Sequence, residues 1–253
     1  MLFAAGRIKY LVTEAFWARG IRITSAYTAN AVPVAEYALS QILFGLKTGW
    51  QHVAACRQAR RFDRLPVAGG YGSTVGIVSL GAVGRLVVER LRPFDLHVIA
   101  YDPYVASEAA AALGVALQTL EDLFGLADVV SVHTPWLKET EGLITGTHIA
   151  LMKPYATFIN TSRGAVVRED EMIAVLAARP DLTAVLDVTY PEPPQPDSAL
   201  WELPNVLLTL HIAGSVGPEC RRMGRLMVEE LRRYLAGQPL RHEITPKQAA
   251  IMA

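Results

Sequence analysis

Three charged side chains have the types that the reduction of a keto acid requires. Arg163 can bind a carboxylate through two parallel hydrogen bonds, His211 can carry a proton near neutral pH, and Glu192 can hold a protonated imidazole. Taken singly, each also fits an ordinary role: a loop cation, a buried histidine and a solvated residue of a proline-rich loop. Each, however, follows an apolar run that is typical of a strand. Because ligands of a parallel α/β sheet bind beyond the carboxyl ends of its strands, we predict one shared site.

A glycine-rich turn lies earlier in the chain, at residues 79–84, and reads Ser-Leu-Gly-Ala-Val-Gly. It follows an apolar run and precedes a helical pattern, a setting in which free N–H groups and the helix dipole bind a pyrophosphate. Asp102 stands at the end of the next predicted strand, where a carboxylate can bind both ribose hydroxyls and repel a 2′-phosphate. The turn therefore predicts NAD rather than NADP. The alternative is a turn that serves only close packing of a helix on a strand, with Asp102 as a cap.

The elements that must position these residues alternate along the chain. Strands are expected at residues 74–80, 96–101, 128–132, 157–160, 184–187 and 206–209, and helices at 84–91, 107–113 and 169–178. This alternation predicts βαβ crossovers and a doubly wound α/β fold of Rossmann type with a parallel sheet. A buried helix is expected at 33–46, with Pro33 in its first turn, then a glycine-rich break at 68–73, and an amphipathic helix at 219–236.

The composition is that of a globular protein. The 253 residues include 24 Lys+Arg and 24 Asp+Glu, with 51% hydrophobic and 19% charged residues. A disordered tail or a coiled coil needs fewer apolar residues or more charge, and a nucleic-acid-binding protein normally has a basic surplus. The best apolar stretch, 37–46, is too short for a membrane span, and Cys56 and Cys220 form no disulfide framework or zinc site. We expect a cytoplasmic protein that binds no metal, membrane or nucleic acid.

Ordered short segments along nearly the whole chain resemble the D-isomer-specific 2-hydroxyacid dehydrogenases, which include phosphoglycerate dehydrogenases and glyoxylate/hydroxypyruvate reductases. The matching segments lie at residues 31–36, 74–84, 101–103, 132–135, 159–164, 186–188, 192–193 and 207–214. The resemblance implies an NAD-dependent oxidoreductase that transfers a hydride between nicotinamide and C2 of a small 2-hydroxy or 2-keto acid. It also implies a homodimer formed through the region of the interdomain helix.

The same resemblance assigns roles to individual residues. Arg163 is expected to bind the substrate carboxylate and carbonyl, His211 to act as acid-base catalyst, and Glu192 to be its carboxylate partner. Ala5 and Gly6 are expected in a loop that binds the substrate. The residues expected to hold the cofactor are Gly81, Ala82, Val83, Gly84, Asp102, Thr134, Pro135, Thr161 and Asp187, with Asp102 on the adenosine ribose and Asp187 facing the carboxamide.

Three positions depart from the family pattern. Ser79 replaces the first glycine of the turn, Leu210 stands where a proline commonly precedes the histidine, and Thr189 occupies a position that is usually aromatic. None of these changes removes a reacting group. The expected chemistry is therefore retained.

The resemblance also implies a substrate-binding domain of which this chain contains only a part. We expect residues 1–32 to be a remnant of that domain, 33–215 to be the NAD-binding domain, and 216–253 to return to the substrate domain. The chain ends then form an incomplete flavodoxin-like domain. Because domains of about 60 residues are already marginal, we expect exposed apolar side chains, aggregation and weak turnover. The side chains expected to be exposed or poorly covered are those of Phe3, Ile8, Leu11 and Phe16.

Two other functions fit the same residues. One is a non-enzymatic NAD-sensing regulator, because the resemblance extends to transcriptional corepressors with the same three charged residues. The other is an inactive fragment. Turnover with a panel of keto acids separates an enzyme from a regulator.

Overall fold

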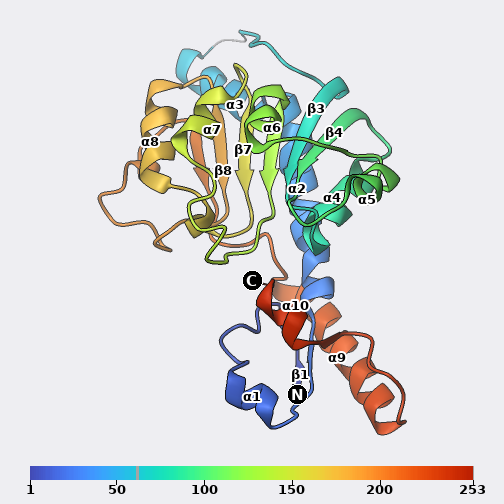
Figure 1. The fold of residues 1–253 in the computed structure, drawn as a ribbon. Helices are drawn as coiled ribbons and strands as arrows, with labels where there is room; N and C mark the ends of the chain where they lie inside the picture. The colour runs from blue at the N-terminus through green and yellow to red at the C-terminus, as the bar shows by residue number, and fades with distance from the viewer. Residues whose placement is uncertain (61–62, 253) are drawn as a thin grey trace.

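A large lobe and a small lobe make up the computed structural model, which describes residues 1–60 and 63–252 (Figure 1). The large lobe is built on a seven-stranded parallel sheet with the order β5-β4-β3-β6-β7-β8-β9. Its strands are β3 (Tyr71–Val78), β4 (Asp95–Tyr101), β5 (Ala116–Leu117), β6 (Val129–Val132), β7 (Thr157–Asn160), β8 (Thr183–Leu186) and β9 (Val206–Leu208). The strand arrows point towards the small lobe, so the carboxyl ends face it. The doubly wound α/β fold is confirmed.

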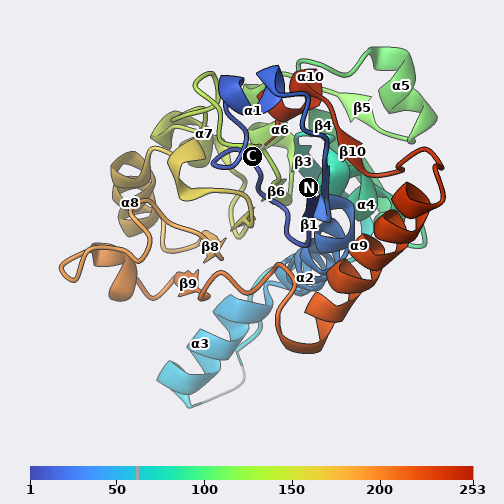
Figure 2. The same cartoon turned by 90° about the horizontal axis from the view of Figure 1, so that it is seen from below.

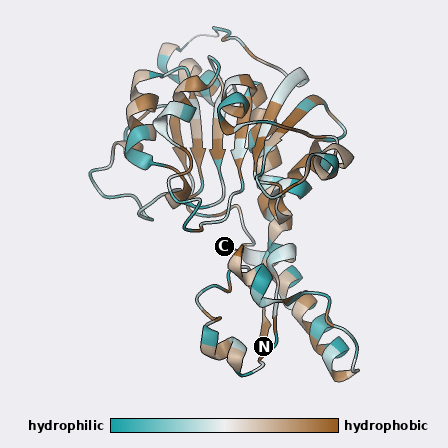
Figure 3. Ribbon diagram, in the orientation of Figure 1, coloured by the Kyte–Doolittle hydropathy of each residue, from teal (hydrophilic) through white to brown (hydrophobic). Residues whose placement is uncertain are grey.

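Helices cover both faces of this sheet, which explains why β6, β7 and β8 are buried along their whole length (Figure 3). On one face lie α2 (Tyr27–Leu46), α4 (Ala82–Leu91) and α5 (Ser107–Ala112). On the other lie α6 (Leu120–Leu126), α7 (Gly146–Leu151) and α8 (Glu169–Ala178). One apolar cluster therefore fills each interface between the sheet and a helical layer.

Two boundaries differ from the sequence-based prediction by more than two residues. Strand β3 begins at Tyr71, inside the glycine run that was expected to be a break, and its register with β4 shifts between Tyr71 and Thr74. Gly72 has φ +69° there, so the run forms an irregular strand start rather than a loop. Helix α2 begins at Tyr27, six residues before the predicted start, and carries Pro33 in its interior. Its extra turns are stabilised by Ala29, which packs in a cluster with Met223 and Met227 of α9 (Cys220–Leu235), a contact that local propensity does not reveal.

The sequence-based prediction also missed several short elements, because distant packing contacts stabilise them. Strand β5, helix α3 (Gly49–Ala59) and helices α6 and α7 have no clear periodic pattern of their own. Three 3-10 turns add Gly164–Val166, Ala199–Trp201 and Gly217–Glu219. Among the described residues, the structure contains no helix with the length and apolarity that a bilayer crossing requires.

The small lobe combines both ends of the chain (Figure 2). Its three-stranded sheet has the order β1-β2-β10, with β2 parallel to β1 and antiparallel to β10. The elements are β1 (Leu2–Phe3), α1 (Glu14–Ala18), β2 (Ile23–Ser25), α9 (Cys220–Leu235), β10 (Glu243–Ile244) and α10 (Pro246–Ala250). Helix α2 crosses the predicted boundary between residues 32 and 33 without a break, so both lobes share it.

The expectation of a poorly covered apolar N-terminal segment is wrong for Ile8 and Phe16. Ile8 is fully buried and Phe16 is 8% exposed, while Phe3 and Leu11 are half-buried. The reason is that Ile244 and Ala249, from β10 and α10, pack against them and supply the cover that the N-terminal residues lack by themselves.

Candidate functional site

The glycine-rich turn joins β3 to α4, with Gly81 as the N-cap residue. A Cβ atom at Gly84 would lie 2.1 Å from the carbonyl oxygen of Ser79, so only glycine allows this contact of helix and strand. Ser79 itself has φ +79°, the left-handed conformation that glycine adopts most readily. Its Oγ lies 2.9 Å from Thr134 Oγ1, a hydrogen bond that offsets part of the backbone strain.

The start of α4 fits a pyrophosphate group. No side chain caps the first N–H groups of this helix, and nothing lies within 4 Å of the Cβ position of Gly81. Open space beside free N–H groups at a helix N-terminus is a suitable site for an anion. Residues 81–83 therefore could hold the phosphates of a dinucleotide.

Asp102 lies at the end of β4, as predicted, and its carboxylate holds the turn in place. Oδ2 accepts a hydrogen bond of 2.7 Å from Leu80 N, and Oδ1 accepts one of 2.9 Å from Tyr104 N. A carboxylate has about four acceptor positions, so two remain for ribose hydroxyls. The side chain thus serves the structure of the turn and stays available to a ligand.

A cavity of about 430 Å³ opens between the two lobes beside this turn. It gathers the predicted residues Gly6, Gly81, Ala82, Val83, Thr134, Pro135, Thr161 and Arg163. Within the described part of the chain, six other predicted residues lie outside its lining: Ala5, Gly84, Asp102, Asp187, Glu192 and His211. The lining also includes residues that were not predicted as site residues, among them Arg7, His133 and Gln248. Arg7 directly follows the predicted loop and His133 directly follows a strand, which are signals that could have identified them; Gln248 has no such signal.

His211 and Glu192 form a close pair beside a second cavity of about 250 Å³. His211 Nδ1 lies 2.7 Å from Glu192 Oε1, and each side chain is a little under half exposed. The Nδ1 contact leaves Nε2 available to a ligand. A proton donor held by a carboxylate is the arrangement that sequence reasoning predicted for these two residues.

Asp187 fixes the loop that carries His211. It is 2% exposed, and its carboxylate accepts hydrogen bonds of 2.6 Å from Thr209 Oγ1, 2.8 Å from Ile212 N and 2.9 Å from Ala213 N. The His211 N–H donates to the carbonyl oxygen of Asp187, and the backbone at His211 has φ +54°. Asp187 therefore holds the loop on both sides of His211, whose backbone is in the left-handed conformation.

Arg163 is positioned by the loop that follows β7. Asn160 Nδ2 donates to the carbonyl oxygen of Arg163, and its Oδ1 accepts from the N–H and hydroxyl of Ser162. A Cβ atom at Gly164 would lie 2.0 Å from the carbonyl carbon of Thr189, so this loop contacts the loop that leads to Glu192. Burial, then repulsion by Arg7, lowers the pKa of the Arg163 guanidinium, while Glu192 raises it.

His133 is a neutral group in the wall of the larger cavity. Burial lowers its pKa to about 3, and its ring nitrogens lie 3.0 Å from Ser131 Oγ and 3.3 Å from Thr161 Oγ1. Its imidazole ring is therefore neutral near pH 7 and does not titrate there. The acid-base candidate at the site is His211.

The chain is similar in sequence to known dehydrogenases. Residues 41–213 match the family model described as D-isomer specific 2-hydroxyacid dehydrogenase, NAD binding domain. The D-3-phosphoglycerate dehydrogenase of Mycobacterium leprae is 38% identical over 227 residues, and that of Archaeoglobus fulgidus is 33% identical over 237 residues. Each match covers 89% of this chain and 43% of the relative. The chain thus spans less than half the length of these relatives.

Solved structures share the arrangement of both lobes. The holo form of D-mandelate dehydrogenase from Rhodotorula graminis matches with a TM-score of 0.79 and 29% identity, covering 96% of this chain and 74% of that one. The TT0316 protein from Thermus thermophilus matches with a TM-score of 0.78 and 29% identity, covering 96% of this chain and 78% of that one. With a family model that spans more than half of its residues, the chain belongs to the D-isomer specific 2-hydroxyacid dehydrogenase family and contains its NAD-binding domain.

Proposed function

We propose that this chain binds NAD and catalyses hydride transfer between the cofactor and C2 of a small 2-hydroxy or 2-keto acid. The observation that carries the proposal is the 2.7 Å contact between His211 and Glu192. Arg163 lies in the loop after β7, at the same carboxyl edge of the sheet, and Glu192 raises its pKa. A proton donor, its carboxylate partner and a carboxylate-binding cation are the groups that this reaction needs.

Each of the three residues has a distinct role in the proposed reaction. Arg163 binds the substrate carboxylate and stabilises the negative charge that develops on the carbonyl oxygen. His211 donates a proton to that oxygen in reduction and accepts it in oxidation. Glu192 holds the imidazole by its Nδ1 side and stabilises its charged form. When bound, NADH supplies the hydride that C2 receives.

Residues 81–83 hold the cofactor's pyrophosphate, and Asp102 binds the adenosine ribose in this proposal. A carboxylate at that position repels a 2′-phosphate, so NADH should bind more tightly than NADPH. Asp102→Ala should bring the two affinities closer together. Because Leu80 N loses its acceptor in that variant, a thermal melt must accompany the titration.

The proposal includes the homodimer expected from the sequence. Support comes from Phe44 at the end of α2 and Val53 on α3, which are 38% and 40% exposed. Apolar side chains exposed on neighbouring helices favour association. Light scattering coupled to gel filtration, with Val53→Glu as the disrupting variant, tests this part separately.

The proposed function is tested with the purified 253-residue chain. NADH binding is measured by fluorescence titration, and reduction of hydroxypyruvate, glyoxylate and other keto acids by NADH absorbance. His211→Asn should lower turnover by about 10²-fold or more with little change in NADH affinity, because the proton donor acts in the transition state. The control is His97→Asn, on the exposed part of β4, which should leave both unchanged.

The outcomes test the alternative functions. NADH binding without turnover of any keto acid contradicts the enzyme and is the result expected of both an NAD-sensing regulator and an inactive fragment. Absence of NADH binding in a folded chain contradicts both the enzyme and the regulator.

A further inference from the structure

Tyr37 lies outside both cavities, yet its hydroxyl contacts a residue that supports the His211 loop. Tyr37 is half-buried on α2, and its hydroxyl oxygen lies 3.0 Å from Thr209 Oγ1. It is not among the described residues that line the larger or the smaller cavity, so it does not contact a ligand bound in either. Thr209 donates its own hydroxyl to Asp187 Oδ1 at 2.6 Å. The contact with Thr209 therefore links Tyr37 to the site.

The direction of these hydrogen bonds follows from the protons available. A carboxylate has acceptor positions only, so the short bond to Asp187 uses the one hydroxyl proton of Thr209. The proton between Tyr37 and Thr209 then comes from the phenol, and Tyr37 is the donor. Burial raises the pKa of the Tyr37 hydroxyl, Thr209 lowers it and the charge of Asp187 raises it, so the phenol keeps its proton near neutral pH. Hydrogen bonds that are donated in one direction polarise one another, so the phenol strengthens the bond from Thr209.

The loop that receives this support is strained and has little packing of its own. His211 has φ +54°, a conformation that a residue other than glycine keeps only where its surroundings hold it. The side chains of Leu210 and Ile212 are 84% and 46% exposed, so packing contributes little to fixing the loop. The N–H groups of Ile212 and Ala213 instead donate to Asp187. The position of His211 therefore depends on the hydrogen bonds that hold the Asp187 carboxylate.

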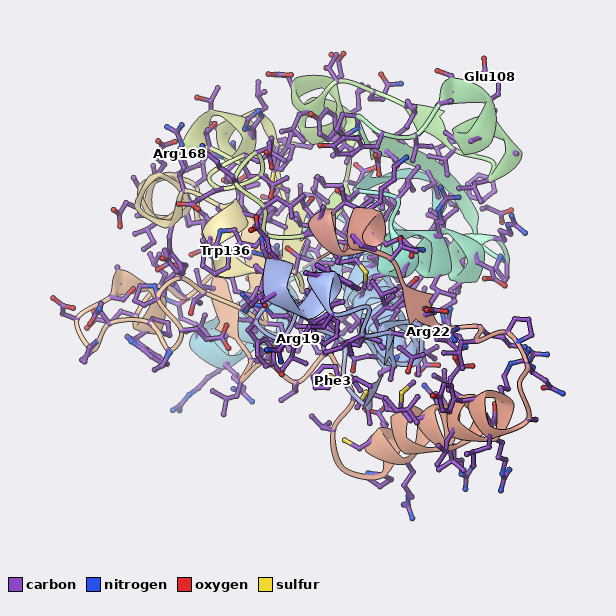
Figure 4. All side chains as sticks on the ribbon, turned by 60° about the horizontal axis from the view of Figure 1, so that its bottom comes forward. Phe3, Arg19, Arg22, Glu108, Trp136 and Arg168 are labelled. Atoms are coloured by element: carbon purple, nitrogen blue, oxygen red, sulfur yellow. The ribbon has the colours of Figure 1, made fainter. Side chains whose placement is uncertain are left out.

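Helix α2 is a rigid support for the Tyr37 hydroxyl. The helix is 20 residues long and runs from the small lobe into the large lobe (Figure 1). Figure 4 views the molecule from the side of the small lobe, with Phe3 and Arg19 of that lobe in front of the large lobe. Ala35 and Ala38, on either side of Tyr37 in the sequence, are fully buried in the apolar cluster on this face of the sheet. The core therefore fixes the helix that presents Tyr37 to the loop after β9.

We propose that Tyr37 is a positioning residue for His211, acting from α2 through the hydrogen bonds of Thr209 on the loop that carries the histidine. This inference rests on the proposed function, in which His211 is the acid-base catalyst. The Tyr37 hydroxyl matters in the chemical step, when the imidazole must be aligned with the substrate oxygen, and not in the binding of NADH. Its removal should therefore lower kcat and leave the affinity for the cofactor unchanged.

The alternative is that Tyr37 only stabilises the fold. A stabilising role changes the fraction of folded protein, but it does not change the turnover of each folded site. Turnover is therefore referred to the concentration of NADH-binding sites, which is measured by fluorescence titration of the same sample. Urea unfolding of each variant gives the stability separately.

The experiment compares Tyr37→Phe with the unmodified chain, because phenylalanine keeps the ring and removes only the hydroxyl. The substrate is whichever of hydroxypyruvate and glyoxylate the unmodified chain reduces faster. In Tyr37→Phe, kcat per NADH-binding site should fall by about 3- to 10-fold, while the Kd of NADH changes by less than about 2-fold. Tyr71→Phe is the matched control, because Tyr71 is 84% exposed at the start of β3, and it should leave both quantities unchanged.

A double-mutant cycle tests whether the effect passes through Thr209. Thr209→Val removes the hydroxyl and keeps the shape of the side chain, so adding Tyr37→Phe to it should change kcat by less than about 1.5-fold. Thr209→Ser keeps the hydroxyl, so in that background Tyr37→Phe should again lower kcat by about 3-fold or more.

Several outcomes overturn the inference. An unchanged kcat per site in Tyr37→Phe means that the hydroxyl does not position the histidine, and a loss of stability alone then assigns it to the fold. Equal losses of kcat in the unmodified and Thr209→Val backgrounds mean that the effect does not pass through Thr209. A matching loss of NADH affinity means that Tyr37 acts on the cofactor site.

Failure of the proposed function is recognised separately. If no keto acid is turned over, hydrogen exchange of the amides of residues 209–213 in the free chain tests the inference without activity. Tyr37→Phe should raise this exchange by about 5-fold or more, and it should add nothing to the exchange of Thr209→Val. Unchanged exchange in Tyr37→Phe overturns the inference, whereas absence of turnover contradicts only the proposed function.

Discussion

Among single residues, Gly81 and Gly84 of the glycine-rich turn have different roles. A Cβ at Gly84 would lie 2.1 Å from a backbone oxygen, whereas nothing lies within 4 Å of the Cβ position of Gly81. Gly84→Ala should therefore lower the free energy of unfolding by about 3 kcal/mol or more, since backbone must shift. Gly81→Ala should cost under about 1 kcal/mol but weaken NADH binding, because the methyl group occupies the space proposed for the pyrophosphate. Urea unfolding and NADH titration of both variants check this, and equal loss of stability would contradict it.

His133 should make the protein sensitive to acid. Its pKa is about 3 in the folded chain against 6.5 as the ordinary value. Between these pH values the unfolded chain binds a proton that the folded chain does not, so stability falls as pH decreases below about 6.5. Because the residue is partly exposed, we expect a loss of about 1–2 kcal/mol between pH 7 and pH 5.

The His133→Gln variant should lose this part of the pH dependence, as measured by urea unfolding at both pH values. His97→Gln, an exposed histidine on β4, is the control and should retain it. The same pH dependence in His133→Gln and in the unmodified chain would show that other groups cause the acid sensitivity.

At the scale of elements, the loop after β9 depends on one carboxylate beneath it. Asp187 accepts three hydrogen bonds from residues on both sides of His211. In Asp187→Asn, an amide group faces one of these donors and leaves it unsatisfied, which should cost about 2 kcal/mol of stability. Misplacement of His211 should lower turnover by about 10-fold or more.

Hydrogen exchange of residues 209–213 gives a readout of this loop that does not depend on activity. Asp181→Asn is the matched control, because Asp181 pairs with Arg179 at the surface, and it should cost under about 1 kcal/mol. Unchanged exchange in Asp187→Asn would mean that the loop is held by other contacts.

At the scale of the whole molecule, the small lobe depends on the C-terminal end of the chain. Ile244 is 3% exposed and packs with Ile8, Phe16 and Ile23. Ile244→Ala should destabilise this lobe by about 2–4 kcal/mol and raise the exchange of amides in residues 1–25, with little change in β6 and β7. Ile21→Ala is the control, because Ile21 is 37% exposed. Uniform loss of protection in both lobes would instead show that they unfold as one unit.

Local sequence patterns were enough to predict the alternation of strands and helices and to single out the candidate site residues at the strand ends. The apolar runs that become β6, β7 and β8 and the polar residues that follow β7, β8 and β9 are local patterns, visible without knowledge of distant contacts. The close pairing of His211 with Glu192 agrees with that expectation, because the carboxyl ends of parallel strands meet at one edge.

Contacts between distant parts of the chain establish which residues line the larger cavity and what covers the small lobe. Helix α2 begins at Tyr27, before Pro33, because α9 packs on its first turns. Ile8 is buried because residues from the opposite end of the chain contact it. Arg7 and Gln248 reach the cavity for the same reason, since both belong to a lobe assembled from the two chain ends. Such contacts join residues more than 200 positions apart, and local sequence patterns contain no signal for them.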